Sequence, residues 1–291
     1  MDKRQMSTKE NTLDQSRLVE SMKRHPVVWF FGITLSFTWI YELLIFGILK
    51  LPMYYLVPGG YGPTLTAIFL TIMTSGRTGI RNIAQRCLYW RTGWRWYLVV
   101  FGSLPALMLL CILLIPAAKA ALQMPTYTAA LTYIPLFILT LLLFGPLAEE
   151  VGWRGFALPL LQQRYGPLVG TVILGGFWGM WHLPLFLFVP GYNGAGADIG
   201  SKLLAFFLFV IFCIPLAILF TWVFNGTRGS LLMVIILHTV NNTSPVWLFL
   251  GSVPKSIGDG ILKYLFTIGL ALLAVLLLLM TRGRLRYKRS L

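Results

Sequence analysis

Eight apolar segments of roughly 20 residues each recur along this chain, and their length constrains its fold more than any other feature. A helix needs about 20 consecutive apolar residues to cross the hydrocarbon core of a bilayer. By residue number the segments are 27–49, 55–74, 97–118, 129–148, 168–189, 203–225, 230–250 and 261–281. The sequence therefore predicts an all-α fold, a polytopic transmembrane helical bundle with about eight spans.

The composition agrees with this prediction. Of the 291 residues 57% are hydrophobic and 11% are charged, whereas a soluble domain carries about 25% charged residues. Too little polar surface remains to cover a water-soluble globule. We expect an integral, multi-pass protein, and the short loops between spans favour a bacterial cell membrane.

The net charge of +15 is distributed between the ends of the predicted spans. Five of the 24 Lys and Arg residues lie on one side: Lys50, Lys119, Lys202, Lys255 and Lys263. The others lie in the two tails and in the loops of the opposite side. Because cytoplasmic loops are rich in Lys and Arg, this asymmetry predicts eight spans with both termini in the cytoplasm. It does not favour a nucleic-acid partner.

The segments divide the chain into four regions. Residues 1–26 are predicted to form a cytoplasmic N-terminal tail with some helix, and residues 27–128 form N-terminal transmembrane helices with a basic loop. In that loop, 76–96, Arg alternates with Trp and Tyr, which is typical of an interfacial helix. Residues 129–250 form a helical core, and 251–291 form the last span and a basic C-terminal tail.

A few ionisable residues lie in or against the apolar segments, where each costs about 2.5–3.5 kcal/mol on insertion scales. Two of them, Glu149 and Glu150, stand in the stretch GPLAEEVGWRG. On a helix Glu150 and Arg154 share a face, while Glu149 is rotated by about 100°. One carboxylate can therefore pair with Arg154 while the other faces elsewhere. Alternatively, the stretch is an ordinary helix end at the cytoplasmic interface.

Two of the three histidines also lie inside predicted spans. His182 follows Trp178 by one helical turn, and His238 precedes Asn242 by one turn. Each could instead make a structural contact, either with a backbone carbonyl or with a neighbouring helix. Burial in a single bundle interior would let these residues and the acidic pair satisfy one another. Glu42, in the first span, is a weaker candidate for the same cluster.

Two chemistries use such a set. A carboxylate and a histidine can activate water, with His and Asn donating hydrogen bonds to a developing oxyanion. Alternatively, Glu149, His182 and His238 form a plausible zinc ligand set with an open position for water. The HExxH motif of soluble zinc proteases is absent from the sequence, so the spacing does not require a metal.

These residues resemble the motifs of the CPBP family, the CAAX-type prenyl endopeptidases and their Abi relatives. The family motif EExxxR matches the run from Glu149 to Arg154. A second motif, an aromatic residue one turn before a histidine, matches Trp178 and His182. The family usually has Phe at the aromatic position, so Trp178 departs from the pattern, although Phe177 is adjacent.

The third family motif, HxxxN or HxxxD, matches His238 and Asn242. The three motifs occur in order between about residues 145 and 245, the family's core, and they leave the N-terminal spans uncovered. Each motif alone is common, but the ordered set within apolar helices is specific.

The resemblance implies a helical bundle with a cavity that reaches the cytoplasmic side and peptide-bond hydrolysis in or near the membrane. It implies that Glu149 is the general base for water and that His182 assists it. His238 and Asn242 would then stabilise the oxyanion. The catalytic set would be completed by the ion pair of Glu150 and Arg154, which orients the site. Family members are often described as metalloproteases, yet a metal-free mechanism uses the same residues.

Three functions are consistent with the sequence. The first is an intramembrane endopeptidase whose substrate is a membrane-associated peptide, either prenylated and CAAX-like or a leader peptide. The second is a non-catalytic membrane regulator or bacteriocin self-immunity protein on the same scaffold. The third is a transporter or proton relay, but the repeated broken helices typical of transporters are not evident. The expected partners are a peptide or protein substrate and the lipid bilayer.

Overall fold

The computed structural model of the chain describes residues 16–250 and 256–288. Within these residues, eight helical segments are long and apolar enough to cross a membrane: Pro26–Ile48, Met53–Cys87, Trp94–Leu114, Tyr127–Tyr165, Pro167–Phe188, Ile199–Gly226, Leu231–Phe249 and Gly260–Thr281. The prediction of an all-α transmembrane bundle with about eight spans is confirmed. The described residues contain one isolated antiparallel bridge, between Leu122 and Leu250, and no strand.

Most of the spans are built from consecutive helical pieces rather than from one straight helix. The α-helices are α2 (Pro26–Glu42), α3 (Leu56–Gly60), α4 (Gly62–Cys87), α5 (Trp94–Leu114), α6 (Pro116–Ala120), α7 (Tyr127–Leu143), α8 (Pro146–Glu150), α9 (Leu158–Tyr165), α10 (Pro167–Trp181), α11 (Leu183–Phe188), α12 (Ile199–Gly226), α13 (Leu231–Thr243) and α14 (Lys263–Thr281). Three π-helical pieces cover Leu43–Ile48, Val151–Ala157 and Ser256–Leu262. Three 3₁₀ turns cover Met53–Tyr55, Tyr192–Gly194 and Pro245–Phe249.

Two helical segments are longer than the apolar runs that predicted them. The fourth was predicted to end at residue 148, but its helical pieces continue to Tyr165. Glu149 and Glu150 therefore lie within the span and not after it. Neighbouring helices bury both carboxylates, so they are not at a solvent-exposed helix end. Apolar run length alone does not show this.

The second span also continues into the basic loop. The helix bends at Gly76, where φ is 60° and ψ is −150°, and then runs on to Cys87. Residues 88–93 separate it from α5. The predicted helix over 76–96 thus covers only the first half of that loop, and its place at the headgroup level stays a prediction. In the N-terminal tail, residues 16–24 are helical, as expected.

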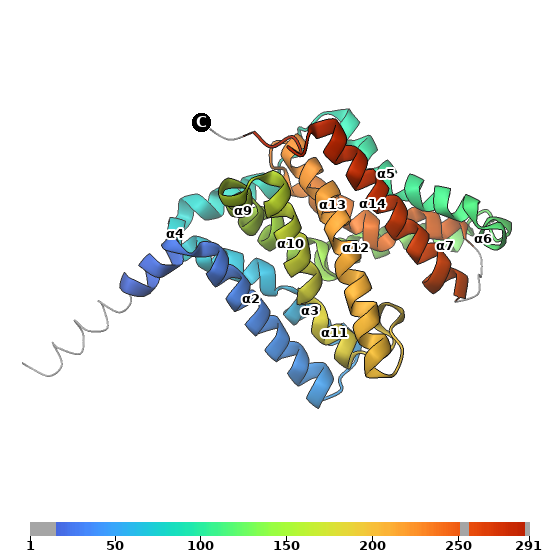
Figure 1. Cartoon of the computed structure of the whole chain (residues 1–291), viewed down its shortest axis with the longest axis horizontal. Helices are drawn as coiled ribbons and strands as arrows, with labels where there is room; N and C mark the ends of the chain where they lie inside the picture. Colours follow the sequence, from blue (N-terminus) through green and yellow to red (C-terminus); the bar gives the residue numbers. More distant parts are fainter. Residues whose placement is uncertain (1–15, 251–255, 289–291) are drawn as a thin grey trace, which may run out of the picture.

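Helix α10 lies between α2 and α12 near the middle of the bundle (Figure 1). The rings of Phe31 on α2 and Phe177 on α10 stack with centroids 4.0 Å apart. Helix α12 also packs against α14, and α13 packs against α5. The core side chains, such as Trp153, Leu174 and Phe220, are fully buried. This arrangement surrounds the segment that contains the acidic pair.

The π-helical piece after the acidic pair touches α4 backbone to backbone. A Cβ atom at Gly152 would lie 2.5 Å from the backbone carbonyl of Pro63, which is too close for any side chain. Glycine is therefore required at this position. The close approach fixes the segment that carries Glu150 and Arg154, and π-helical turns of this kind occur frequently at functional sites.

The two ends of the bundle differ in the loops they carry. We call one the basic end; it comprises residues 86–96, 226–230 and 282–288, together with the start of α2. The opposite end comprises residues 48–53, 115–126 and 188–199. In Figure 1, α10 and α12 run between these ends, with the C-terminal segment at the upper, basic end and α11 at the lower, opposite end.

Candidate active site

The acidic pair lies at a sharp turn between α7 and the rest of the fourth span. Gly145 has a φ of 112°, a conformation that favours glycine, and Pro146 begins α8 directly after it. A Cβ atom at Gly145 would lie 2.7 Å from Oε1 of Glu149. Glycine therefore turns the chain and also leaves room for the carboxylate. The turn was not predicted, although the dipeptide Gly-Pro is a recognised breaker signal.

Glu150 lies in an ion pair inside the bundle. Arg154 Nη1 donates to its Oε1 over 2.9 Å, and neither side chain has any exposed surface. His238 Nδ1 donates to the same oxygen over 2.8 Å. The guanidinium carbon of Arg154 lies 4.4 Å from the centre of the Trp178 ring. We call Glu150, Arg154 and His238 the ion-pair side of the site.

Glu149 faces a different direction, as its rotation along the helix predicts. Its Oε2 accepts a hydrogen bond of 2.6 Å from Trp178 Nε1. Its Oε1 and the Nδ2 atom of Asn242 both lie within 4 Å of the place where a Cβ of Gly145 would be. Glu149 is 5% exposed, whereas Glu150 is fully buried. Trp178 was considered only as a motif position, but its indole binds the carboxylate directly.

His182 lies near this carboxylate, at the junction of α10 and α11. Its Nδ1 is 2.9 Å from the backbone carbonyl of Trp178. A carbonyl oxygen only accepts, so Nδ1 carries a proton and Nε2 of the neutral ring has a lone pair. The ring lies between Trp181 and Phe209, with centroid distances of 4.7 and 4.8 Å. We call Glu149, His182 and Asn242 the cavity side of the site.

A cavity of about 670 Å³ reaches Asn242 from the end of the bundle opposite to the basic end. Its wall combines aromatic rings with amides and other polar groups: Met108, Gly191, Tyr192, Asn193, Gly194, Phe209, Phe212, Asn241, Asn242, Trp247, Leu262, Lys263, Phe266 and Thr267. Asn242 is exposed in this cavity, and its Oδ1 accepts a hydrogen bond of 3.0 Å from Asn241. Phe209, which contacts His182, lines the same space. Of the cavity side, Asn242 is the residue that forms part of the cavity wall.

Two further residues adjoin the site. Glu42 in the first span is 1% exposed, and its carboxylate interacts electrostatically with that of Glu149. Tyr192 lines the cavity; burial, with the carboxylates of Glu149 and Glu42, raises the pKa of its phenol, which stays protonated at neutral pH. Glu42 is thus close to the cluster for which it was the weaker candidate, and the loop that contains Tyr192 has no motif from which this residue could be predicted.

The arrangement does not fit the three-ligand metal centre considered from the sequence. Among the described residues, no three His, Cys, Asp or Glu side chains are grouped closely enough to hold a metal ion. We therefore derive no step through zinc.

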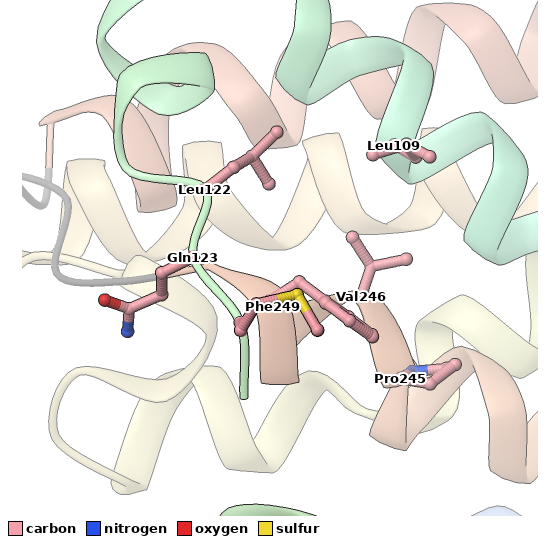
Figure 2. Close-up of a pocket in the computed structure, with 7 residues that line it drawn as sticks. Leu109, Leu122, Gln123, Pro245, Val246 and Phe249 are labelled. Carbon is pink, nitrogen blue, oxygen red and sulfur yellow. The ribbon is translucent and has the colours of Figure 1, made fainter. Parts of the chain in front are cut away.

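A second cavity lies on the other side of the Pro245–Phe249 turn and has a volume of about 540 Å³. Leu109 on α5, Leu122 in the following loop, and Val246 and Phe249 in the turn surround it (Figure 2). Trp247 of the same turn lines the polar cavity instead. The turn, which begins three residues after Asn242, thus separates an apolar space from the polar cavity.

Comparison with known proteins agrees with the geometry. Residues 130–244 match the family model described as type II CAAX prenyl endopeptidase Rce1-like, and this stretch contains all six candidate residues. The part of the chain that carries the candidate site is therefore similar to the Rce1-like family. The chain is also 29% identical over 242 residues to CAAX prenyl protease 2 of Methanococcus maripaludis, which covers 81% of this chain and 85% of that protein.

The match to this family model confirms the resemblance drawn from the motifs. It supports a membrane-embedded endopeptidase, and it does not favour a non-catalytic regulator or a self-immunity protein. The matched stretch lies within the predicted core of residues 129–250. The first three spans lie outside it, although they provide Glu42 and part of the packing around the site.

Proposed function

We propose that this endopeptidase hydrolyses a peptide bond at the inner end of the polar cavity, using water activated by Glu149. The observation that carries this assignment is the contrast within the acidic pair. Glu150 is tied to Arg154 and His238, whereas Glu149 is directed toward Asn242, where the cavity ends. A general base must be within reach of the proton it removes, and Glu149 is the carboxylate of the pair that meets this requirement.

The proposed reaction begins with a water between Glu149 and the substrate carbonyl. Glu149 takes a proton from the water as its oxygen bonds to the carbonyl carbon, which gives a tetrahedral oxyanion. That proton then passes to the departing nitrogen as the C–N bond breaks. The products are a carboxylic acid, which keeps the second water proton until it ionises, and an amine. Trp178, which donates to Oε2 of Glu149, leaves Oε1 for the water.

His182 is proposed to hold the same water. Its Nδ1–H is fixed by the carbonyl of Trp178, so the Nε2 lone pair can accept a hydrogen bond from the water. This bond would align a water lone pair with the carbonyl carbon. In this role His182 assists Glu149 without replacing it.

The oxyanion is proposed to bind His238 and Asn242, which project from one face of α13. Asn242 donates through Nδ2. His238 donates from Nε2 in its doubly protonated form, beside the carboxylate of Glu150 that accepts from Nδ1. Arg154 and Glu150 do not touch the reacting atoms in this proposal; they position His238. Donors fixed in a site with little water are the most effective stabilisers of such charge.

For the substrate we propose a membrane-associated peptide, of which a prenylated CAAX-like peptide and a leader peptide are the two candidates. The name of the Methanococcus maripaludis relative favours the first. The apolar cavity beside the Pro245–Phe249 turn could receive a hydrocarbon chain attached to the peptide. Each buried CH₂ group of such a chain would contribute about 0.8 kcal/mol to binding.

The test is a proteolysis assay with the purified full-length chain in lipid vesicles. Prenylated and unmodified versions of one CAAX-like peptide, and a leader peptide, are offered to the wild type and to Glu149→Gln. We expect at least one peptide to be cleaved, with a rate about 10²–10⁴-fold lower in the variant. Equal cleavage by both proteins would exclude Glu149 as the base, and cleavage of no peptide would count against the proposed substrates.

Val246→Trp tests the place of the hydrocarbon chain, because it fills the apolar cavity without touching the polar one. We expect it to raise KM for the prenylated peptide and to leave the KM of the unmodified peptide unchanged. A parallel elemental analysis of active protein tests the metal alternative: near-stoichiometric zinc that is needed for activity would overturn the metal-free route.

A further inference from the structure

Arg86 is the inward-facing member of the arginine-rich segment 76–96. It lies in the last turn of α4, outside the stretch that matches the family model. The four other arginines of the segment are exposed: Arg77, Arg81, Arg91 and Arg95. Arg86 is instead partly buried, with its guanidinium carbon 4.9 Å from the centre of the Phe224 ring. A charge withdrawn from the surface in this way needs polar partners inside the bundle.

The partners of Arg86 are three backbone carbonyls on two separate elements. Its Nη1 donates to the carbonyl of Gly155 over 3.1 Å, and its Nη2 donates to that of Arg154 over 3.4 Å. Both carbonyls belong to the π-helical piece Val151–Ala157. Its Nε donates to the carbonyl of Gly229 over 3.0 Å, in the turn before α13. We call these three hydrogen bonds the Arg86 bridge.

The sequence itself leaves an acceptor open where the bridge meets the π-helical piece. Pro159, in the first turn of α9, has no backbone N–H to donate. In α-helical spacing the missing N–H would bind the carbonyl of Gly155, and in π-helical spacing it would bind that of Arg154. These are the two carbonyls of the piece that accept from Arg86. Arg86 therefore supplies a donor that the helix lacks.

The two elements joined by the Arg86 bridge carry the ion-pair side of the site. Glu150 and Arg154 lie at the start and in the middle of the π-helical turn, and His238 lies on α13. Nδ1 of His238 and Oε1 of Glu150 are 2.8 Å apart. This distance depends on how α13 is placed against the fourth span. The bridge joins the two elements at the start of α13, about 12 Å along the helix from His238.

We propose that Arg86 is a positioning residue for the hydrolysis, which keeps His238 aligned with Glu150 by joining the π-helical piece to the start of α13. The proposal rests on the oxyanion-binding role proposed above for His238. Arg86 itself touches no reacting atom. Without the bridge the two elements can shift against each other, and a misplacement of about 1 Å in a catalytic group can lower a rate about 10²-fold.

Kinetics of Arg86 variants test the role of the bridge. The full-length wild type, Arg86→Ala and Arg86→Lys are purified into lipid vesicles and assayed on a peptide that the wild type cleaves. We expect kcat to fall about 10–100-fold in Arg86→Ala, with KM within about threefold of the wild type. Arg86→Lys keeps the charge but loses the planar fork that reaches two elements, so its kcat should fall at least about fivefold.

Arg81→Ala is the matched control, because Arg81 lies on the same helix but is exposed. It should leave both kcat and KM as in the wild type. A wild-type kcat in Arg86→Ala, an equal loss in Arg81→Ala, or a raised KM with a normal kcat would each overturn the proposal.

A double variant separates the positioning of His238 from a general loss of stability. If Arg86 acts through His238, adding Arg86→Ala to His238→Ala should lower the single-turnover rate no further, because the two changes are coupled. Effects that multiply would show that Arg86 supports the fold by another route and would overturn the proposal. A wild-type rate in His238→Ala would instead reject the oxyanion role itself.

The last readout does not depend on cleavage. The chain has three histidines, His25, His182 and His238, so protein labelled with ¹⁵N-histidine gives one set of ring signals for each. We expect the His238 signals to move in Arg86→Ala and in Arg86→Lys, and those of His25 to stay in place. Arg81→Ala should move none of them. Moved His238 signals in a protein that cleaves no peptide would keep the bridge and reject the proposed substrates, whereas unmoved His238 signals in Arg86→Ala would reject the bridge.

Discussion

Glu149 and Glu150 are neighbours in the chain, yet they face regions that differ in burial and in bonding. On the ion-pair side, Glu150 has no exposed surface and binds both Arg154 and His238 through one oxygen. On the cavity side, Glu149 accepts one indole N–H, and its Oε1 lies beside the same glycine as Nδ2 of Asn242, a residue of the cavity wall. The comparison suggests that one carboxylate maintains the geometry while its neighbour carries out the chemistry.

The largest expected effect is a difference in protein stability between variants of the two carboxylates. Glu150→Gln leaves the Arg154 charge buried without its counter-ion, which should lower the free energy of unfolding by about 3–5 kcal/mol. Glu149→Gln still offers an oxygen to Trp178 and should change it by less than about 0.5 kcal/mol. Thermal unfolding of both proteins in detergent measures this. Equal loss of stability in the two variants would remove the distinction between the two sides.

The ion pair is also the part of the site that the sequence predicts best. Glu150 and Arg154 are four residues apart, so a local helical rule is enough to pair them. The count of eight spans follows from run length for a similar reason. In contrast, the bond between Trp178 and Glu149 joins residues 29 positions apart, and it depends on how α10 packs against the fourth span. No local pattern contains that information.

The position of Glu42 and the location of the cavity could not be predicted from the sequence either, because both depend on packing between distant helices. Glu42 comes from a span outside the family motifs, and only the packing of the first span places it near Glu149. The motifs likewise identify the residues of the site but not the end of the bundle at which it opens. The cavity wall includes loop residues such as Asn193 and Trp247, which no motif contains.

The next largest effect concerns the oxyanion. Asn242→Ala removes a proposed donor on the cavity side, and we expect kcat to fall about 10²–10³-fold, as for other oxyanion-hole donors, with KM little changed. The matched control is Asn225→Ala on α12, whose side chain donates to the carbonyl of Leu285 at the basic end. Steady-state kinetics on a cleaved peptide give both constants. A rise in KM with normal kcat would instead make Asn242 a binding residue.

A smaller effect tests how Glu149 is positioned. Trp178→Phe removes the 2.6 Å hydrogen bond to Glu149 and keeps a ring beneath Arg154. A hydrogen bond to a charged group contributes about 1.5–3 kcal/mol, so we expect kcat to fall about 10–150-fold with an unchanged KM.

Trp181→Phe is the matched control for this substitution. Trp181 lies three residues further along the same helix, and its Nε1 has no hydrogen-bond partner among the described residues. Its replacement should therefore leave kcat within about threefold of the wild type, because no hydrogen bond is lost. If both Trp variants lose activity equally, the packing of the rings matters and the bond to Glu149 does not.

The smallest expected effect tests whether Glu42 belongs to the cavity side of the site. Glu42 is buried, one of its oxygens, Oε2, has no partner among the described residues, and it faces the carboxylate of Glu149. Glu42→Gln puts an uncharged amide of the same size at this buried position, so we expect a change in stability of less than about 1 kcal/mol and a change in kcat of less than tenfold. Glu20→Gln, which removes only an exposed ion pair with Arg24, should change stability by less than about 0.5 kcal/mol. Loss of activity in Glu42→Gln beyond a hundredfold would extend the cavity side to the first span, because a spectator carboxylate cannot account for a loss of that size.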